Sequence, residues 1–274
     1  MLRERSAIAL LLFPLIVWVI ADGSWLYEAS IMGILAMAAY EYGTLFRAGG
    51  YRPAIPLLII GVIAIVLIRA NYGFEVDYLL LAGIGLIAMT WHVIDFERGA
   101  PKSGTDFALT LTGIFYVGWI GAFFITIRHM PDGLWWFLLS LLSIWIADSA
   151  ALLFGRRFGR HQLAPRVSPK KTWEGYVAGI GMGILGGAGL ALLWRIGAGP
   201  LAGINAMSGA IIGGVVGTVA PIGDLGISMF KRQFGEKDTG ALLPGHGGAL
   251  DRIDTWLWSS VIGYFLAILL TNAG

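Results

Sequence analysis

The chain lacks cysteine and carries few charges. None of its 274 residues is a cysteine, which excludes disulfides, thiolate metal sites and cysteine nucleophiles. Only 13% of the residues are charged and four are histidine, whereas 57% are hydrophobic. Several apolar runs approach the roughly 20 residues that cross a bilayer, and they are continuous rather than alternating. The composition therefore predicts an all-α polytopic integral membrane protein and argues against a soluble domain or a membrane β-barrel.

Nine apolar segments can be marked in the sequence, and each predicts a transmembrane helix. The start of the chain is basic and then apolar, like a signal peptide. It has no convincing small-residue cleavage site, so we expect it to be retained as the first helix. The nine segments are 6–21, 27–45, 54–68, 77–94, 107–127, 134–154, 175–194, 204–223 and 255–271.

The basic residues are distributed unevenly between the two ends of these segments. Cytoplasmic loops of membrane proteins collect Lys and Arg. With nine spans and a cytoplasmic N-terminus, 16 of the 19 basic residues fall on the cytoplasmic side, and the exceptions are Arg69, Arg128 and Arg195. We therefore expect a cytoplasmic N-terminus and an inner-membrane location in a prokaryote.

Glycines recur at four-residue spacing in the seventh and eighth segments, at Gly175, Gly179, Gly183 and Gly187, and again from Gly209. Such spacing forms a flat helix face that lets two backbones approach closely. Packing within one subunit is the favoured interpretation, and a homodimer through these glycine-rich faces is the alternative. The chain shows no sequence repeat, which argues against an inverted-repeat transporter.

Two long polar loops divide the chain into two regions. Residues 1–130 hold the first five segments with short loops between them, and residues 131–274 hold the other four. The second region contains both long loops, 155–174 and 224–254, and both are predicted to lie on the cytoplasmic side. We expect this second region to be the catalytic part of the membrane domain.

The first long loop contains Ser168, Pro169, Lys170, Lys171 and Thr172 just before a predicted helix. Positive-inside bias and contact with anionic lipid headgroups explain part of its charge. Hydroxyls, lysines and free backbone N–H groups grouped at a helix start also predict an anion-binding site, although no Walker-type pattern accompanies them.

Four aspartates fall at or near predicted cytoplasmic helix ends. Asp148 lies about two turns inside its segment, where a charge is costly and such residues usually face a polar cavity. Asp224 closes the eighth segment, while Asp251 and Asp254 are three residues apart and share one face of a helix. Their oxygens suit a hard cation, Mg²⁺ first. Each alone could equally be a cap or a solvated side chain. Glu41, near the end of its segment, is read as interfacial rather than catalytic.

The second long loop carries a dense motif that spans 27 residues. This motif resembles the signature of the phosphatidate cytidylyltransferase family, the CDP-diacylglycerol synthases. Segments around Asp148 and from Ser168 to Gly175 also resemble that family, whereas Ala249 stands where the family usually has a larger aliphatic residue. The matching positions are Ser228, Lys231, Arg232, Lys237, Asp238, Leu243, Pro244, His246, Gly247, Gly248, Asp251, Arg252, Ile253 and Asp254.

The resemblance implies that CTP and phosphatidic acid react to CDP-diacylglycerol and pyrophosphate with Mg²⁺, and a second metal ion is open. It implies metal binding by Asp224 and Asp251, with Asp148 and Asp254 as further candidates. Lys231 and His246 join the two metal-binding aspartates as catalytic candidates. The expected substrate-binding residues are Ser168, Lys170, Lys171, Thr172, Ser228, Arg232, Lys237, Asp238, Gly247, Gly248 and Arg252.

Two alternatives stay open at this point. A related CTP-dependent enzyme could act on another lipid phosphate or alcohol, because the spans carry no readable code for the acyl chains. An ion-coupled transporter could also place Asp148 and Asp224 inside a bundle, although transporters usually put such sites near the midplane. The expected partners are CTP, phosphatidic acid and membrane lipids, and no nucleic acid.

Overall fold

Helices account for most of the chain that the computed structural model describes, namely residues 16–199, 203–240 and 247–272. The helices are α2 (Trp25–Ala48), α3 (Ile55–Tyr72), α4 (Asp77–Glu97), α5 (Ser103–Gly113), the π-helix η1 (Ile114–Trp119), α6 (Phe123–His129), α7 (Gly133–Phe158), α8 (Trp173–Ala198), α9 (Ala206–Val219), α10 (Pro221–Gln233) and α11 (Leu250–Asn272). A short antiparallel hairpin joins β1 (Gln162–Ala164) to β2 (Ser168–Thr172).

Eight helical stretches in the described residues are long and apolar enough to cross a membrane. They are α2, α3, α4, the α5–η1–α6 run, α7, α8, the α9–α10 run and α11, and they match the second to ninth predicted segments. The prediction of a polytopic helical membrane protein is confirmed. The first predicted segment, 6–21, lies mostly outside the described residues.

The predicted bounds of the second long loop, 224–254, are wrong at both ends. Helix α10 continues to Gln233, and α11 begins at Leu250. Pro221 opens α10 at its first turn, and Lys231 and Arg232 lie in its last turn, where cations stabilise the helix dipole. Three of the charges that suggested a loop, those of Asp224, Lys231 and Arg232, therefore belong to an amphipathic helix.

Two further predictions differ in detail from the observed elements. Much of the expected loop 155–174 is ordered as the end of α7 and the β1–β2 hairpin. The fifth predicted span, 107–127, is interrupted by η1, whose wider turn interrupts the regular α-helical bonding.

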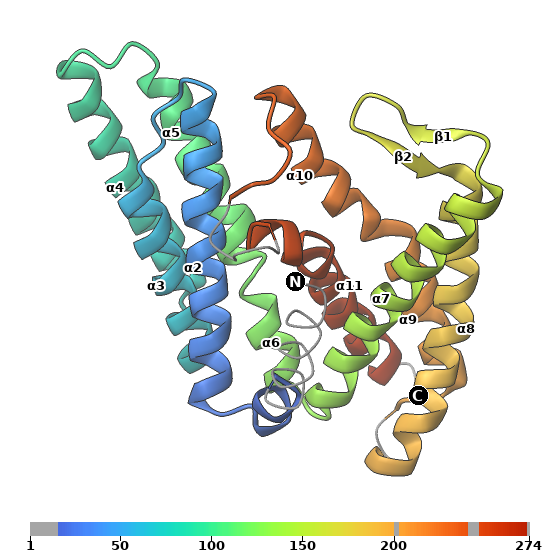
Figure 1. Cartoon of the computed structure of the whole chain (residues 1–274). Helices are drawn as coiled ribbons and strands as arrows, with labels where there is room; N and C mark the ends of the chain where they lie inside the picture. The colour runs from blue at the N-terminus through green and yellow to red at the C-terminus, as the bar shows by residue number, and fades with distance from the viewer. Residues whose placement is uncertain (1–15, 200–202, 241–246, 273–274) are drawn as a thin grey trace.

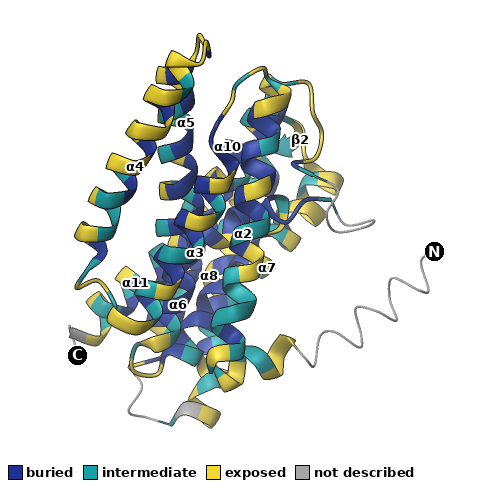
Figure 2. Cartoon of the chain, turned by 90° about the vertical axis from the view of Figure 1, so that its left-hand side faces the viewer, coloured by how far each residue is buried: buried dark blue, intermediate teal, exposed yellow. Residues whose placement is uncertain are grey.

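Helix α11 lies between two groups of helices (Figure 1). One group runs from α2 to α6 and the other from α7 to α9, and α11 packs against α6, α7 and α9. One hydrophobic core includes Leu58 of the first region and Leu257 of the second. Helix α4 presents a long exposed face at the edge of the bundle (Figure 2), as expected for a helix in contact with lipid.

The glycine faces are used inside the chain. A Cβ atom at Gly213 would overlap the carbonyl oxygen of Gly183, and one at Gly209 would overlap that of Gly187. Glycine at these positions lets α8 and α9 cross in backbone contact, which supports the interpretation as packing within one subunit.

The polar elements gather at one end of the bundle. The β1–β2 hairpin, the C-terminal end of α10 and the α4–α5 turn lie at this end (Figure 1). Helix α11 begins closer to the middle of the bundle than the tip of α10 (Figure 1). Among the described residues, Arg69, Arg128 and Arg195 are the Lys and Arg residues at the ends of helices on the opposite side.

Candidate active site

A lysine of the hairpin contacts the first aspartate of α10. Lys171 Nζ lies 2.6 Å from Asp224 Oδ2, and both side chains are partly exposed. Ser228, one turn later on α10, donates to Asp224 Oδ1 at 3.2 Å. Arg232 Nε donates to the carbonyl oxygen of Val167 at 3.4 Å, so the hairpin is attached to α10 at a second point. These contacts bring the β1–β2 hairpin of the first long loop together with α10.

Asp251 accepts more hydrogen bonds than a simple helix cap would need. Lys231 Nζ lies 2.5 Å from Asp251 Oδ1, and both side chains are about one tenth exposed. The other oxygen, Oδ2, accepts from the Thr239 N–H at 2.8 Å, the Thr239 hydroxyl at 3.0 Å and the Gly248 N–H at 3.3 Å. Asp251 therefore connects α10, the residues after it and the start of α11.

Asp254 and Asp148 lie beside these two ion pairs. Asp254 is 5% exposed, and its Oδ1 accepts from the Thr255 N–H at 2.6 Å. It lies within electrostatic range of Asp224, Lys231 and Asp251, and Asp148 on α7 lies within range of Lys171 and Asp224. Asp148 and Asp224 are thus close enough to influence each other electrostatically, as expected for two acids near the same end of the bundle.

Gly223 allows this meeting of helices. A Cβ atom there would overlap the carbonyl oxygen of Asp254 and crowd the ring of Trp258. Only a residue without a side chain lets the first turn of α10 lie against α11 at this distance. Trp258 in turn donates from Nε1 to the Tyr116 hydroxyl at 2.9 Å, which ties α11 to η1.

Gly247 brings further motif residues to Asp251. Its φ of +80° is in the left-handed region that favours glycine. A Cβ atom built there would lie 3.6 Å from Asp238 Oδ1, 3.7 Å from Asp251 Oδ2 and 3.9 Å from Arg252 Nη2. An acid, a base and the central aspartate therefore surround a backbone that a ligand could approach closely.

Glu41 was predicted to be interfacial rather than catalytic, and the structure places its side chain against residues that also contact or adjoin Asp251. The side chain of Glu41 on α2 is 1% exposed, and its Oε2 accepts from the Thr239 hydroxyl and the Leu250 N–H, each at 3.0 Å. The Thr239 hydroxyl also contacts Asp251, so one threonine joins the two carboxyl groups. Sequence reasoning missed this residue because the contact crosses more than 190 positions and no local pattern marks it.

The other predicted residues occupy the rim or have local contacts. Lys170, Lys237 and Arg252 are exposed, and Ser168 is half-buried in β2. The Thr172 hydroxyl accepts from the Gly175 N–H at 3.2 Å and caps α8, so its predicted role in anion binding competes with a structural one. His246 lies outside the described residues.

The donor chemistry of the cluster fits a hard cation, because its oxygens come from carboxylates. Its arrangement in the present structure does not form a ready-made metal centre. Lysines contact Asp224 and Asp251, and the described part of the chain holds no group of three or more His, Asp or Glu side chains arranged around one point.

Comparisons with known proteins agree with the motif. The model of the cytidylyltransferase family matches residues 3–270. A protein of Synechocystis sp. named phosphatidate cytidylyltransferase is 30% identical over 283 residues, which cover 90% of this chain and 90% of that protein. One of the same name from Staphylococcus aureus (strain COL) is 36% identical over 177 residues, covering 63% of this chain and 64% of that protein.

A plant relative extends the comparison. The phosphatidate cytidylyltransferase 5, chloroplastic, of Arabidopsis thaliana is 28% identical over 278 residues, covering 90% of this chain and 67% of that protein. The family match spans both regions of the chain, including the helices that lack the motif. The chain therefore belongs to the cytidylyltransferase family and is a membrane-embedded nucleotidyltransferase.

Proposed function

We propose that the protein transfers the cytidylyl group of CTP to phosphatidic acid, giving CDP-diacylglycerol and pyrophosphate. The observation that carries the proposal is the placement of two Lys–Asp pairs, Lys171–Asp224 and Lys231–Asp251, beside the buried Asp254. The names of the relatives support the choice of both substrates.

The chemistry requires little acid–base help from the protein. A phosphate monoester loses its second proton near pH ~6, so phosphatidic acid is largely a dianion at neutral pH. One of its oxygens attacks the α-phosphorus of CTP and forms the new P–O bond. The bond from that phosphorus to the bridging oxygen breaks, and pyrophosphate leaves with the electron pair.

The main obstacle is repulsion between two polyanions, and the basic residues address it. Catalysis of such a transfer is mostly positioning and charge neutralisation. In the present structure Lys171 and Lys231 neutralise aspartates. We infer that both ammonium groups turn toward phosphate oxygens when substrates bind, and that Arg232 and Arg252 screen the pyrophosphate. Lys170 would contribute from the exposed face of β2.

Mg²⁺ is part of the proposal. Asp224, Asp251 and Asp254 would hold it, with Asp148 as a further contributor, and it would supply charge neutralisation at the transferring phosphate. Turning the two lysines toward the phosphates would free the oxygens of Asp224 and Asp251 for this role. The same movement would place the two ammonium groups on the phosphates of CTP and leave the two carboxylates free to bind Mg²⁺.

We also propose that the site faces the cytosol. Cytoplasmic segments are rich in Lys and Arg, and the end of the bundle that carries the site holds nearly all the described basic residues. CTP would reach the site from this side while the diacyl chains of the lipid stay in the membrane. Inner-membrane residence in a bacterium and a role in phospholipid synthesis follow from the same proposal.

The test uses the purified protein in detergent with phosphatidic acid, Mg²⁺ and CTP labelled either in the cytidine or in the γ-phosphate. We expect the cytidine label to enter the organic phase and the γ-label to remain in water as pyrophosphate. EDTA should abolish the transfer. A polyprenyl phosphate in place of phosphatidic acid should accept no label.

Three outcomes would contradict the proposal in different ways. Lack of cytidine label in lipid would overturn nucleotidyl transfer to phosphatidic acid. Better transfer to the polyprenyl phosphate would move the substrate to another lipid class. Undiminished transfer with EDTA present would remove the metal from the mechanism.

A further inference from the structure

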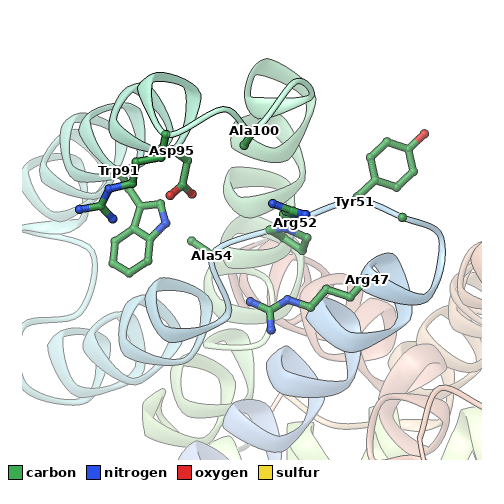
Figure 3. Close-up of a pocket in the computed structure, with 10 residues that line it drawn as sticks. Arg47, Tyr51, Arg52, Ala54, Trp91, Asp95 and Ala100 are labelled. Atoms are coloured by element: carbon green, nitrogen blue, oxygen red, sulfur yellow. The ribbon is translucent and has the colours of Figure 1, made fainter.

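A basic cavity lies in the N-terminal region, and no motif residue lines it. It has a volume of about 620 Å³ and is formed by the α2–α3 loop, the end of α4 and the α4–α5 turn. Figure 3 shows Arg47 and Arg52 on one side of the cavity, with Trp91 and Asp95 on α4 across from them. The side chains that give the cavity its chemical character are Arg47, Tyr51, Arg52, Trp91, Asp95 and Arg98.

The charges that line the cavity are not balanced. Arg47, Arg52 and Arg98 face one carboxylate, that of Asp95. Within the described chain, none of the three guanidinium groups has a side-chain hydrogen bond or ion pair. Lys102 adds a fourth positive charge at the edge, where its Nζ lies 4.7 Å from the ring centre of Tyr51. Guanidinium groups gathered in this way favour a phosphate, which they bind with paired hydrogen bonds.

The backbone that carries these arginines is held by buried polar contacts. The Arg52 N–H donates to Asp106 Oδ1 at 2.7 Å, and the Ala54 N–H donates to Thr110 Oγ1 at 3.0 Å. His92 Nε2 lies 2.9 Å from the same Thr110 oxygen. Asp106, Thr110 and His92 are each at most 3% exposed. The loop is therefore fixed before any ligand binds, which lowers the entropic cost of binding.

The cavity also borders the face of α4 that is exposed toward lipid. Trp91 lines the cavity and is 41% exposed, and along the same helix Leu86 is 73% and Phe96 is 61% exposed. Tryptophan is enriched where a membrane protein meets the headgroup level of the bilayer. The headgroup of an anionic lipid could contact the arginines of the cavity, while its apolar chain lies along the exposed face of α4.

The cavity is a neighbour of the active site but shares no lining residue with it. The α2–α3 loop packs against Phe234, which follows α10, and the rings of Tyr51 and Phe234 lie 6.3 Å apart. Helix α10 carries Lys231 and Arg232. A bound ligand would therefore support the loop on which the end of this helix rests.

We propose that this cavity binds the phosphate group of an anionic phospholipid, as a site separate from the one that binds the substrates. The inference does not depend on the proposed reaction, because it rests on the cavity, on three arginines whose guanidinium groups have no partner within the described part of the chain, and on the exposed Trp91. A free phosphate ion shares the headgroup chemistry, so the experiment separates the two sources.

The test measures binding of short-chain dioctanoyl phosphatidylglycerol to the full chain in detergent by native mass spectrometry. Phosphatidylglycerol is chosen because it is not the proposed substrate. We expect dioctanoyl phosphatidylcholine to bind much more weakly. Replacing Arg52 or Arg98 by Gln should weaken phosphatidylglycerol binding roughly fivefold each, the effect expected for one basic residue near a headgroup. Asp95→Asn should strengthen binding, because it removes the opposing carboxylate.

Arg195→Gln is the matched control, since it removes the same charge from an exposed position at the other end of the bundle, and it should leave binding unchanged. Binding of wild-type strength in the Arg52→Gln, Arg98→Gln double variant would overturn the site. Displacement of the lipid by an equal concentration of inorganic phosphate would overturn the lipid as its ligand. Weaker binding in Asp95→Asn would contradict the charge argument.

Discussion

At the scale of single residues, Asp251 is the position where the contacts converge. It contacts a buried lysine, two backbone N–H groups and a hydroxyl, whereas a helix cap needs only one or two such partners. So many donors hold the carboxylate in one orientation. The three donors at Oδ2 fix the direction of the carboxylate, while Oδ1 would become free for a metal ion once Lys231 turns toward a substrate phosphate.

Replacing Asp251 by Asn tests this residue. The amide keeps the size of the side chain but loses the charge that pairs with Lys231 and that would bind Mg²⁺. We expect the rate of cytidylyl transfer to fall roughly 100- to 1000-fold, a loss typical of removing one electrostatic group from an active site. The thermal unfolding temperature in detergent should also fall, because Lys231 loses its partner, so the rates are compared at a temperature at which both proteins are folded.

Asp132→Asn provides the control for that variant, because it makes the same chemical change in an exposed residue at the start of α7. It should retain normal activity. Near-normal transfer by Asp251→Asn would reduce Asp251 to a structural contact at the start of α11.

At the scale of elements, the site depends on how α10 and α11 are held. Helix α10 carries Asp224, Ser228 and Lys231 on successive turns of one face, and Gly223 lets that face lie against α11. Helix α2 reaches the residues between them through Glu41. Glu41 thereby connects α2, which carries no residue of the motif, to the residues around Asp251.

Variants of Glu41 test the role of α2. Glu41→Ala should leave the Leu250 N–H and the Thr239 hydroxyl without this buried acceptor, at a cost of about 1–3 kcal/mol in stability. We expect a lower unfolding temperature and a reduced rate of transfer. Glu41→Gln keeps an acceptor oxygen, so it should recover most of the stability.

Comparison of the two Glu41 variants separates positioning from packing. If Glu41 positions the residues around Asp251, Glu41→Gln should also restore most of the turnover and leave the KM for CTP near that of the wild type. Equal stability and equal rates in Glu41→Ala and the wild type would contradict the role inferred from the contacts.

At the scale of the whole molecule, most of the basic residues lie at one end of the bundle. The β1–β2 hairpin, the candidate active site and the arginine cavity lie at this same end. The opposite end is poor in charge and is stabilised by a different contact: the guanidinium group of Arg69, 2% exposed, pairs with Asp77 and lies 3.9 Å from the ring centre of Phe74. The buried ion pair of Arg69 and Asp77 therefore lies at the end of the bundle opposite to the site.

The absence of cysteine makes the orientation testable in the intact membrane. Single cysteines introduced as Arg166→Cys, in the exposed turn of the hairpin, and as Asp132→Cys, at the other end, should react with an impermeant maleimide from opposite sides. We expect Arg166→Cys to react in inside-out vesicles and Asp132→Cys in intact cells. The reverse pattern would place the site outside the cytosol.

The sequence by itself determined the membrane class, the second to ninth spans and the main motif residues. Hydrophobic runs of membrane length are local properties, and aspartates or lysines in polar stretches of an apolar chain are conspicuous because their burial is costly. Sequence patterns alone misassigned α10, because its charged residues suggested a loop. An amphipathic helix of 13 residues can carry those charges on one face.

Only the tertiary structure decided which of these groups meet. The pairing of Lys171 with Asp224 joins residues 53 positions apart, and that of Glu41 with Thr239 joins residues 198 positions apart. The arginine cavity likewise depends on two turns that become neighbours only when α2, α3, α4 and α5 pack together. Local sequence patterns report periodicity and composition, whereas these contacts follow from helix packing, which small residues such as Gly223 and Gly213 permit and no single segment encodes.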